Sequence, residues 1–179
     1  MDMATLPEIN RKWKLTSEAE SELRSRLAMA GYYCSAEPAV ETDIYYSQPN
    51  VWVRIRERDN VAEIAYTAIP GSTREIQVMR ADITQAGEAA ALLKAIGAVE
   101  QVRVVKTRAI FKHLALEHAR VVIDQISGVG TFVAVEVALD DADARGAVAN
   151  VERHLQLDEL PVIELPYREL VTRAVTVAS

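Results

Sequence analysis

The stretch Val51-Trp52-Val53-Arg54-Ile55-Arg56-Glu57-Arg58 carries an arginine at every second residue from position 54 to position 58. In a β-strand, residues two apart point to the same face of the sheet. The stretch therefore predicts a strand with one cationic face, while Val53 and Ile55 make the other face apolar. A cationic sheet face suits an anionic ligand, because guanidinium groups hold oxygen acceptors through paired hydrogen bonds.

Three further stretches alternate in the same way. Their charged or polar members are Glu8, Asn10, Lys12 and Lys14, then Lys106, Arg108 and Lys112, and finally Glu136 at the end of Phe132-Val133-Ala134-Val135-Glu136. Two like charges about 6 Å apart repel by roughly 3 kcal/mol at an effective dielectric constant of about 20. A face that gathers several cations therefore needs interleaved carboxylates, water or a bound polyanion.

Length and composition limit the classes of protein that fit. The chain has 179 residues, 50% of them hydrophobic, and a formal net charge of −6. This length predicts a single domain over residues 1–179 with a sizeable core. A negative net charge argues against a general nucleic-acid binder, which needs a broad basic surface. Cationic strands in an acidic chain indicate a small anionic ligand instead.

Other features indicate where the protein works. Cys34 is the only cysteine, which excludes an internal disulfide and a cysteine zinc site. Residues 1–7 lack the apolar core of a signal peptide. No stretch approaches the ~18 uninterrupted apolar residues of a membrane span. We therefore expect a cytoplasmic protein that does not enter a membrane.

The pattern along the chain predicts antiparallel strands interrupted by a few helices. Strands are expected at 7–15, 42–46, 51–57, 61–68, 74–79, 102–111, 114–117, 120–125 and 131–139. A capping box of Ser17 and Glu20 opens the first helix, which ends at Gly31, and further helices are expected near 84–96, 140–155 and 167–174. The order predicts an α+β fold, a mostly antiparallel β-barrel-like tunnel with a few flanking helices.

Taken in order, these stretches resemble the motifs of the CYTH superfamily, also called the triphosphate tunnel fold. The stretches that carry the resemblance are Glu8-Ile9-Asn10-Arg11-Lys12, Val53-Arg54-Ile55-Arg56, Pro70-Gly71-Ser72-Thr73-Arg74, Lys106-Thr107-Arg108, Asp124 followed by Gly128-Val129-Gly130-Thr131-Phe132, and Pro166-Tyr167-Arg168-Glu169-Leu170. The last of these resembles the ending of the bacterial class IV adenylyl cyclases.

The resemblance implies a small-molecule triphosphate as ligand, with Mg²⁺ or Mn²⁺ as cofactor and no nucleic-acid or membrane partner; a homodimer is compatible with it. The phosphate-binding residues that it implies are Lys12, Arg54, Arg56, Arg74, Lys106 and Arg108. The implied metal ligands are Glu8, Asp124 and Glu136. Glu8, Lys12 and Glu136 are the implied catalytic residues.

The chain departs from the family pattern at three positions. Asn10 and Ala134 stand where the family has glutamates, and Thr67 stands where a lysine usually precedes a Gly-Pro turn. Because hard divalent cations prefer carboxylate and other oxygen ligands, the loss of two carboxylates predicts weaker metal binding or altered chemistry.

Three functions remain open on the sequence alone. The first is an adenylyl cyclase-like enzyme that converts ATP to cyclic AMP and pyrophosphate. The second is a triphosphatase acting on inorganic, nucleoside or thiamine triphosphate, and the third is a phosphate-binding module without catalysis. Two of the charged stretches also have a purely structural interpretation. Arg54 and Arg56 could form surface ion pairs with Glu57 and Glu63. Lys106 and Arg108 could form ion pairs with Glu100 or Glu117.

Overall fold

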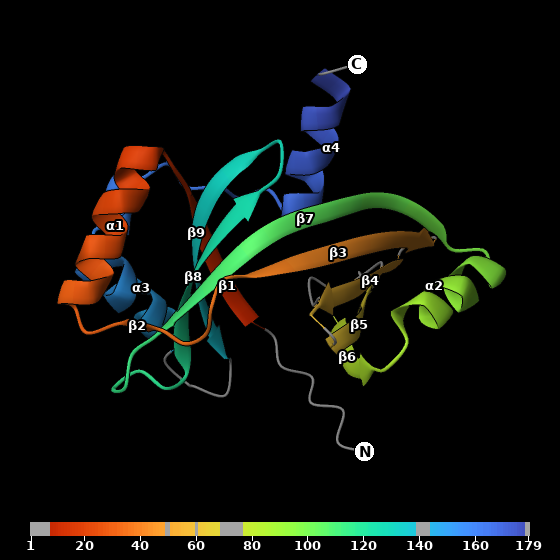
Figure 1. Cartoon of the computed structure of the whole chain (residues 1–179), viewed down its shortest axis with the longest axis horizontal. Coiled ribbons are helices and arrows are strands. Elements are labelled where there is room, and N and C mark those ends of the chain that lie inside the picture. Colours follow the sequence, from red (N-terminus) through yellow and green to blue (C-terminus); the bar gives the residue numbers. More distant parts are fainter. Residues whose placement is uncertain (1–7, 49–50, 60, 69–76, 139–143, 178–179) are drawn as a thin grey trace. The chain divides into compact units, whose positions relative to one another are not determined.

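The computed structural model describes residues 8–48, 51–59, 61–68, 77–138 and 144–177 (Figure 1). Side chains are described over the same ranges except at 8–10, 48, 68, 77, 78, 138 and 144. The elements are, in order, β1 (Glu8–Leu15), α1 (Ser17–Met29), β2 (Tyr33–Cys34), β3 (Ala39–Gln48), β4 (Val51–Arg58), β5 (Val61–Ala68), β6 (Gln77–Ile83), α2 (Ala86–Ala95), β7 (Val99–Lys112), β8 (Ala119–Ile126), β9 (Gly130–Ala138), α3 (Ala144–His154), the 3-10 helix η1 (Leu157–Glu159) and α4 (Tyr167–Val177). This arrangement confirms the predicted α+β class.

The chain divides into two compact units. The first unit contains Val40–Val105 and the C-terminal segment from Pro166, and the second contains Glu8–Ala39 and Lys106–Leu165. Strand β7 runs through the boundary, so its first half belongs to the first unit and its second half to the second. A single domain over residues 1–179 stays a prediction.

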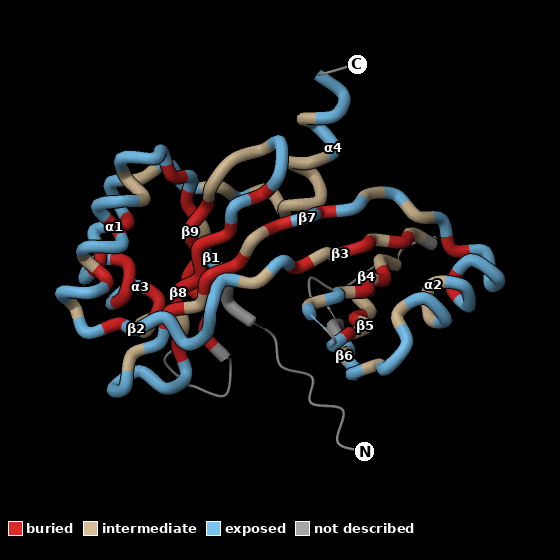
Figure 2. The backbone as a smooth tube through the Cα atoms, viewed as in Figure 1, coloured by how far each residue is buried: buried red, intermediate tan, exposed pale blue. Residues whose placement is uncertain are grey.

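In the second unit, antiparallel strands lie in the order β1-β9-β8-β7, and the short strand β2 also pairs with β7. One face of these strands is apolar and forms a core with α1 and α3, the two helices that lie beside it in Figure 1. The core residues include Trp13, Val135, Leu27 and Leu155, none of which is measurably exposed. Figure 2 shows buried residues along β1, β8 and β9. Because side chains alternate, most charged residues of these strands share the opposite face; Arg11 is the exception and donates to Glu152 of α3 at 2.7 Å.

The first unit repeats this arrangement with the strand order β3-β4-β5-β6, each pair antiparallel. Its apolar face contributes Ile44, Tyr46, Val53 and Ile55 to a core that Leu93 of α2 completes. The arginines of β4 therefore lie on the other face, as their alternation predicts. In each unit, helices pack on the apolar face of the antiparallel strands, α1 and α3 in the second unit and α2 in the first, and most charged strand residues lie on the opposite face.

Helix ends follow local chemistry, with two corrections to the sequence prediction. Thr16, and not Ser17, is the N-cap of α1, and its hydroxyl accepts a hydrogen bond of 3.1 Å from the backbone N–H of Ala19. The predicted stop at Gly31 is confirmed, since this residue adopts a φ of 83° that favours glycine. The sequence predicts that Asp82 or Thr84 caps the second helix, but in the structure Gln85 occupies the N-cap position of α2.

The other differences concern short segments. Residues 114–117 form turns and not the predicted strand, and β7 begins at Val99, three residues earlier than predicted. The predicted strand at 74–79 is observed as β6 from Gln77; residues 74–76, including Arg74, lie outside the described residues. The strand β1 also pairs with the segment at residues 161–163, which the sequence did not indicate. The N–H of Lys14 donates to the carbonyl oxygen of Pro161 at 3.0 Å, and the N–H of Ile163 donates to the carbonyl oxygen of Lys12 at 2.9 Å. Among the described residues, no helix is long and apolar enough to cross a membrane.

Candidate functional site

Three buried charged side chains meet on the polar face of the second unit. The Arg108 guanidinium donates from Nε and Nη2 to the two oxygens of Asp124, both at 2.7 Å, and from Nη1 to Oε1 of Glu136 at 3.2 Å. Arg108 is 5% exposed, Asp124 0% and Glu136 4%. Charges removed from water this completely are costly unless they are paired and hydrogen-bonded, and here they are.

A second arginine completes this group. Nε of Arg120 donates to Oε2 of Glu136 at 2.6 Å, so each oxygen of Glu136 contacts a different arginine. We call Arg108, Arg120, Asp124 and Glu136 the β7–β9 charge cluster. Strand register builds it: Arg108 lies opposite Asp124 on β8, and Arg120 lies opposite Glu136 on β9. Residues directly opposite each other in an antiparallel pair share a face and lie close together.

Two lysines lie on the same face of these strands. Lys106 is two residues before Arg108 and is only 2% exposed. Lys12 of β1 lies opposite Ala134 of β9, and burial lowers the pKa of its ammonium group because removal from water disfavours the charged form. The polar face of the second unit therefore brings Lys12, Lys106, Arg108, Asp124 and Glu136 onto neighbouring strands, as the alternation predicts.

The first unit carries a comparable set, the β3–β5 charge cluster, made of Glu41, Asp43, Arg54, Arg56 and Glu63. Arg56 donates from Nε and Nη2 to the two oxygens of Asp43 at 2.6 and 2.9 Å. Its Nε also lies 3.0 Å from Oε1 of Glu41, and Glu41 and Asp43 are both almost completely buried. Nη2 of Arg54 donates to Glu63. The predicted pairing of Arg54 with Glu63 is confirmed, whereas Arg56 pairs with carboxylates of β3.

Beside this cluster, the first turn of α4 places a cation over aromatic rings. The Arg168 guanidinium carbon lies 5.0 Å from the ring centre of Trp52 and 5.9 Å from that of Tyr45. Burial, and next to it the negative charge of Asp43, raises the pKa of the Tyr45 hydroxyl, while the nearby arginines oppose that shift. Arg168 and Trp52 also line a cavity of about 290 Å³ in the first unit. Thr67, where the family pattern has a lysine, lies opposite Trp52 on β5.

The structure does not describe every predicted site residue. For Glu8 and Asn10 it gives the strand position, opposite Ala138 and Glu136 respectively, and no side chain. Arg74 lies outside the described residues. Glu41, Asp43 and Arg120 were missed by sequence reasoning. Their spacing could have identified them. Glu41 and Asp43 are two residues apart on one strand, and Arg120 and Asp124 are four residues apart on another, so each pair shares a face of its strand.

The donor set of the second unit fits a divalent cation. Asp124 and Glu136 offer the oxygen ligands that Mg²⁺ and Mn²⁺ prefer, and one guanidinium group holds the two carboxylates together. Mg²⁺ usually takes one or two carboxylates and completes its shell with phosphate and water. No group of three or more His, Cys, Asp or Glu gathers as a metal site in the part of the chain that is described.

Comparisons with known proteins agree with this architecture. The family model described as the CYTH domain matches residues 6–162. A search of curated proteins gives no significant match. Among solved structures, the PH1012 protein of Pyrococcus horikoshii is 22% identical, with a TM-score of 0.77 and coverage of 92% of this chain and 99% of the other.

Two further solved structures have names that mention an activity. A proposed adenylate cyclase from Vibrio parahaemolyticus is 17% identical, with a TM-score of 0.74 over 92% of this chain and 97% of the other. A proposed adenylyl cyclase from Hippeastrum, described as having a dominant triphosphatase activity, is 12% identical, with a TM-score of 0.58 over 87% and 88%. At these identities the likeness establishes the fold alone.

Proposed function

The chain belongs to the CYTH domain family, and from this premise we propose that it is a metal-dependent enzyme that binds and cleaves a triphosphate compound. Proteins of this fold bind triphosphate substrates, and enzymes of the family depend on a metal ion. The family model establishes the family, and the reaction and the residues that carry it out are proposed here.

The observation that carries the proposal is the β7–β9 charge cluster. Replacing a buried ion pair by well-packed apolar residues is often neutral or stabilising, so burial of Arg108, Asp124 and Glu136 is not explained by stability. A site that must hold both a polyanion and a cation needs both signs of charge in one place. Buried Lys106 and half-buried Lys12 on the same face add the excess of positive charge that a triphosphate requires.

The residues of the second unit divide into two roles in this proposal. Lys12, Lys106 and Arg108 bind phosphate oxygens, where Arg108 offers a planar fork of donors and the lysines offer point charges. Asp124 and Glu136, together with Glu8, hold Mg²⁺ or Mn²⁺, which when bound neutralises charge on the phosphate groups. In the first unit, Arg54 and Arg56 stay predicted phosphate ligands.

The first candidate reaction is that of an adenylyl cyclase. The ribose 3′-hydroxyl of ATP attacks the α-phosphorus, and pyrophosphate leaves. Such a reaction depends mostly on positioning and on stabilising the charge that develops on the phosphates, which is what fixed cations on rigid strands provide. The segment Pro166–Leu170, which resembles the ending of bacterial cyclases, favours this candidate.

The second candidate is a triphosphatase, in which water attacks a terminal phosphorus. The same cations serve it, and the proposed cyclase from Hippeastrum that has this fold is described with a dominant triphosphatase activity. A catalytically inactive binding module is the third candidate, favoured by Asn10 and Ala134 in place of glutamates and by Thr67 in place of a lysine.

Product analysis distinguishes the three candidates. Purified protein is incubated with ATP, and separately with tripolyphosphate, in the presence of Mg²⁺ or Mn²⁺, and the products are separated by ion-exchange chromatography. Cyclic AMP with pyrophosphate identifies the cyclase, and released orthophosphate identifies the triphosphatase. Glu136→Gln is the matched inactive control. Binding of ATP without either product, with both metals, would leave only the binding module.

A further inference from the structure

Glu136 shares its two carboxylate oxygens between two arginines, and the contact with Arg120 is the shorter one. The distance from Oε2 of Glu136 to Nε of Arg120 is 2.6 Å, against 3.2 Å from Oε1 to Nη1 of Arg108. Glu136 is buried, whereas the Arg120 side chain is 40% exposed. Arg120 thus reaches in from solvent to a carboxylate that the metal site of the proposed function needs.

The four members of the β7–β9 charge cluster carry equal numbers of positive and negative charges, and Lys106 and Lys12 on the same face add further positive charge. Arg108 and Arg120 carry two positive charges, and Asp124 and Glu136 carry two negative charges. Asp124 is already satisfied by the bidentate contact with Arg108. A divalent cation at Glu136 therefore has to displace Arg120 or share the carboxylate with it, and it meets a positive charge in either case.

We propose that Arg120 is a positioning residue that holds Glu136 and thereby weakens the binding of divalent metal at this carboxylate. The inference rests on the metal site of the proposed function. Groups that hydrogen-bond a metal ligand usually strengthen metal binding by orienting it, and the common case is a neutral or negative group that accepts a hydrogen bond from a histidine ligand. A guanidinium differs, because it competes with the metal for the same lone pairs and repels it.

The test is a titration with Mn²⁺ alone, in which the free ion is followed by electron paramagnetic resonance. Arg120→Gln removes the positive charge and keeps a polar side chain of similar length. It is expected to bind Mn²⁺ roughly tenfold more tightly than the wild-type protein, the scale of one nearby unit charge after allowance for exposure. Arg120→Lys keeps the charge and is expected to restore weak binding close to that of the wild type.

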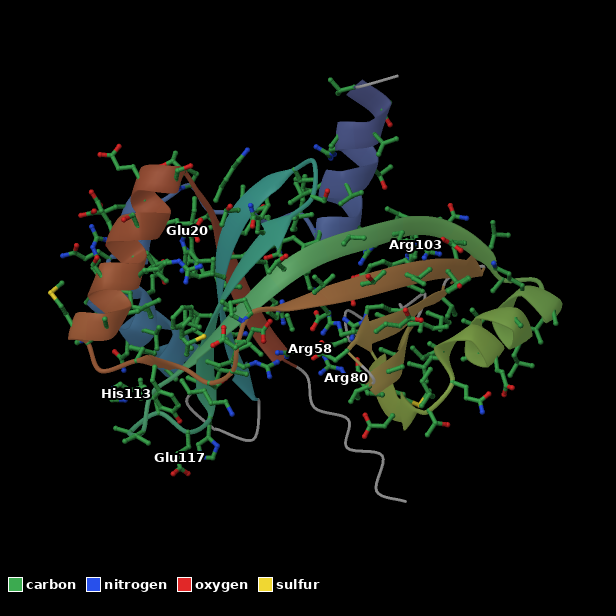
Figure 3. The ribbon with its side chains drawn as sticks, in the orientation of Figure 1. Glu20, Arg58, Arg80, Arg103, His113 and Glu117 are labelled. Atoms are coloured by element: carbon green, nitrogen blue, oxygen red, sulfur yellow. The ribbon has the colours of Figure 1, made fainter. Side chains whose placement is uncertain are left out.

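Two controls assign the effect to Glu136. Arg103→Gln is the matched charge control, since Arg103 is a half-exposed arginine of β7 in the first unit whose Nη2 lies 3.0 Å from Glu100 (Figure 3). It should leave Mn²⁺ affinity unchanged. Adding Glu136→Gln to Arg120→Gln should abolish the gain, because the carboxylate that Arg120 releases is then absent.

Equal or weaker Mn²⁺ binding by Arg120→Gln would overturn the inference, as would an equal gain from Arg103→Gln. Arg120→Ala is a second neutral variant, and circular dichroism establishes that each variant is folded. If neither neutral variant folds, Arg120 serves the fold and the inference is wrong. Tripolyphosphate binding is measured separately by thermal shift: its absence in wild-type protein contradicts the proposed function, whereas a failed inference leaves that binding intact.

Discussion

Arg108 and Asp124 lie directly opposite each other on β7 and β8, and the guanidinium donates from Nε and Nη2 to both carboxylate oxygens. Arg56 and Asp43 repeat this relationship on β4 and β3 of the first unit, through the same pair of nitrogen atoms. In each case the arginine also contacts a second carboxylate, Glu136 or Glu41. Both units therefore fix an arginine on their polar face by the same bidentate pairing across two strands.

Replacement of Asp124 by Asn should destabilise the second unit strongly. The substitution leaves the buried Arg108 guanidinium without its bidentate carboxylate, and breaking one side of a buried ion pair costs roughly 3–5 kcal/mol. For a chain of this length that corresponds to a fall in Tm of roughly 10 °C. Thermal denaturation followed by circular dichroism measures it.

Glu20→Gln is the matched control for that experiment. It also removes a carboxylate from an arginine, Arg24 at 2.8 Å, but the pair lies on the exposed surface of α1, where Glu20 is labelled in Figure 3. Surface pairs of this kind contribute about 0–1 kcal/mol. Equal losses of stability in the two variants would show that the Arg108–Asp124 pair has no special weight.

Tripolyphosphate should stabilise the protein against heat. A ligand that binds only the folded state at about a hundred times its dissociation constant stabilises it by roughly 2.7 kcal/mol. The expected rise in Tm is roughly 5–10 °C for a protein of this size. Orthophosphate at equal concentration should have a much smaller effect, since it reaches fewer cations. No shift with millimolar tripolyphosphate would contradict phosphate binding by Lys12, Lys106 and Arg108.

The pKa of Lys12 should make triphosphate binding sensitive to alkaline pH. Burial lowers this pKa from its usual value, so the ammonium group loses its proton at lower pH than an exposed lysine does. The contribution of Lys12 to binding is therefore complete below the folded-state pKa and is lost as the pH rises through it. Lys12→Arg keeps its charge throughout this range.

The measurement is the ratio of the tripolyphosphate dissociation constants of wild-type protein and Lys12→Arg, from about pH 7 to about pH 10. Ionisation of the ligand affects both proteins equally and cancels in the ratio. We expect the wild type to lose affinity relative to the variant as pH rises. A ratio that stays constant across the range would show that Lys12 does not contact the ligand.

Restoring one family carboxylate should strengthen metal binding. Ala134 is 1% exposed, lies opposite Lys12 and is two residues from Glu136 on the same face. Ala134→Glu is therefore expected to lower the Mn²⁺ concentration that half-saturates the protein, by roughly tenfold or more for a new charged oxygen ligand. The larger side chain should cost about 1–3 kcal/mol of stability.

Ala109→Glu provides the contrasting variant. Ala109 is equally buried, but it faces the apolar core of the second unit, so a carboxylate there is placed among apolar side chains. We expect severe loss of stability without any gain in Mn²⁺ affinity. If Ala134→Glu behaves in the same way as Ala109→Glu, the polar face around Glu136 is not a metal site.

Alternation along single strands was enough to predict much of this molecule. The runs at 51–58 and 106–112 identified which residues share a face, and the structure confirms both the strands and their polar and apolar sides. The α+β class followed from the order of these runs, and their motifs resemble those of the CYTH family, to which the chain belongs. Local preferences were less reliable at short segments. The N-cap of α1 is Thr16, although the neighbouring Ser17 is an equally suitable capping residue. Residues 114–117 form turns and not a strand.

The partner of each charge was decided by the tertiary structure. The sequence predicted a face of cations in need of compensation and offered Glu57, Glu100 and Glu117 among the candidates. The structure instead pairs Arg108 with Asp124 and Glu136, which are 16 and 28 residues away. Periodicity within a strand determines which face a side chain takes, but only the register between strands determines what it meets there. Register is set by the packing of the apolar faces against α1, α2 and α3, and that packing is a property of the whole fold.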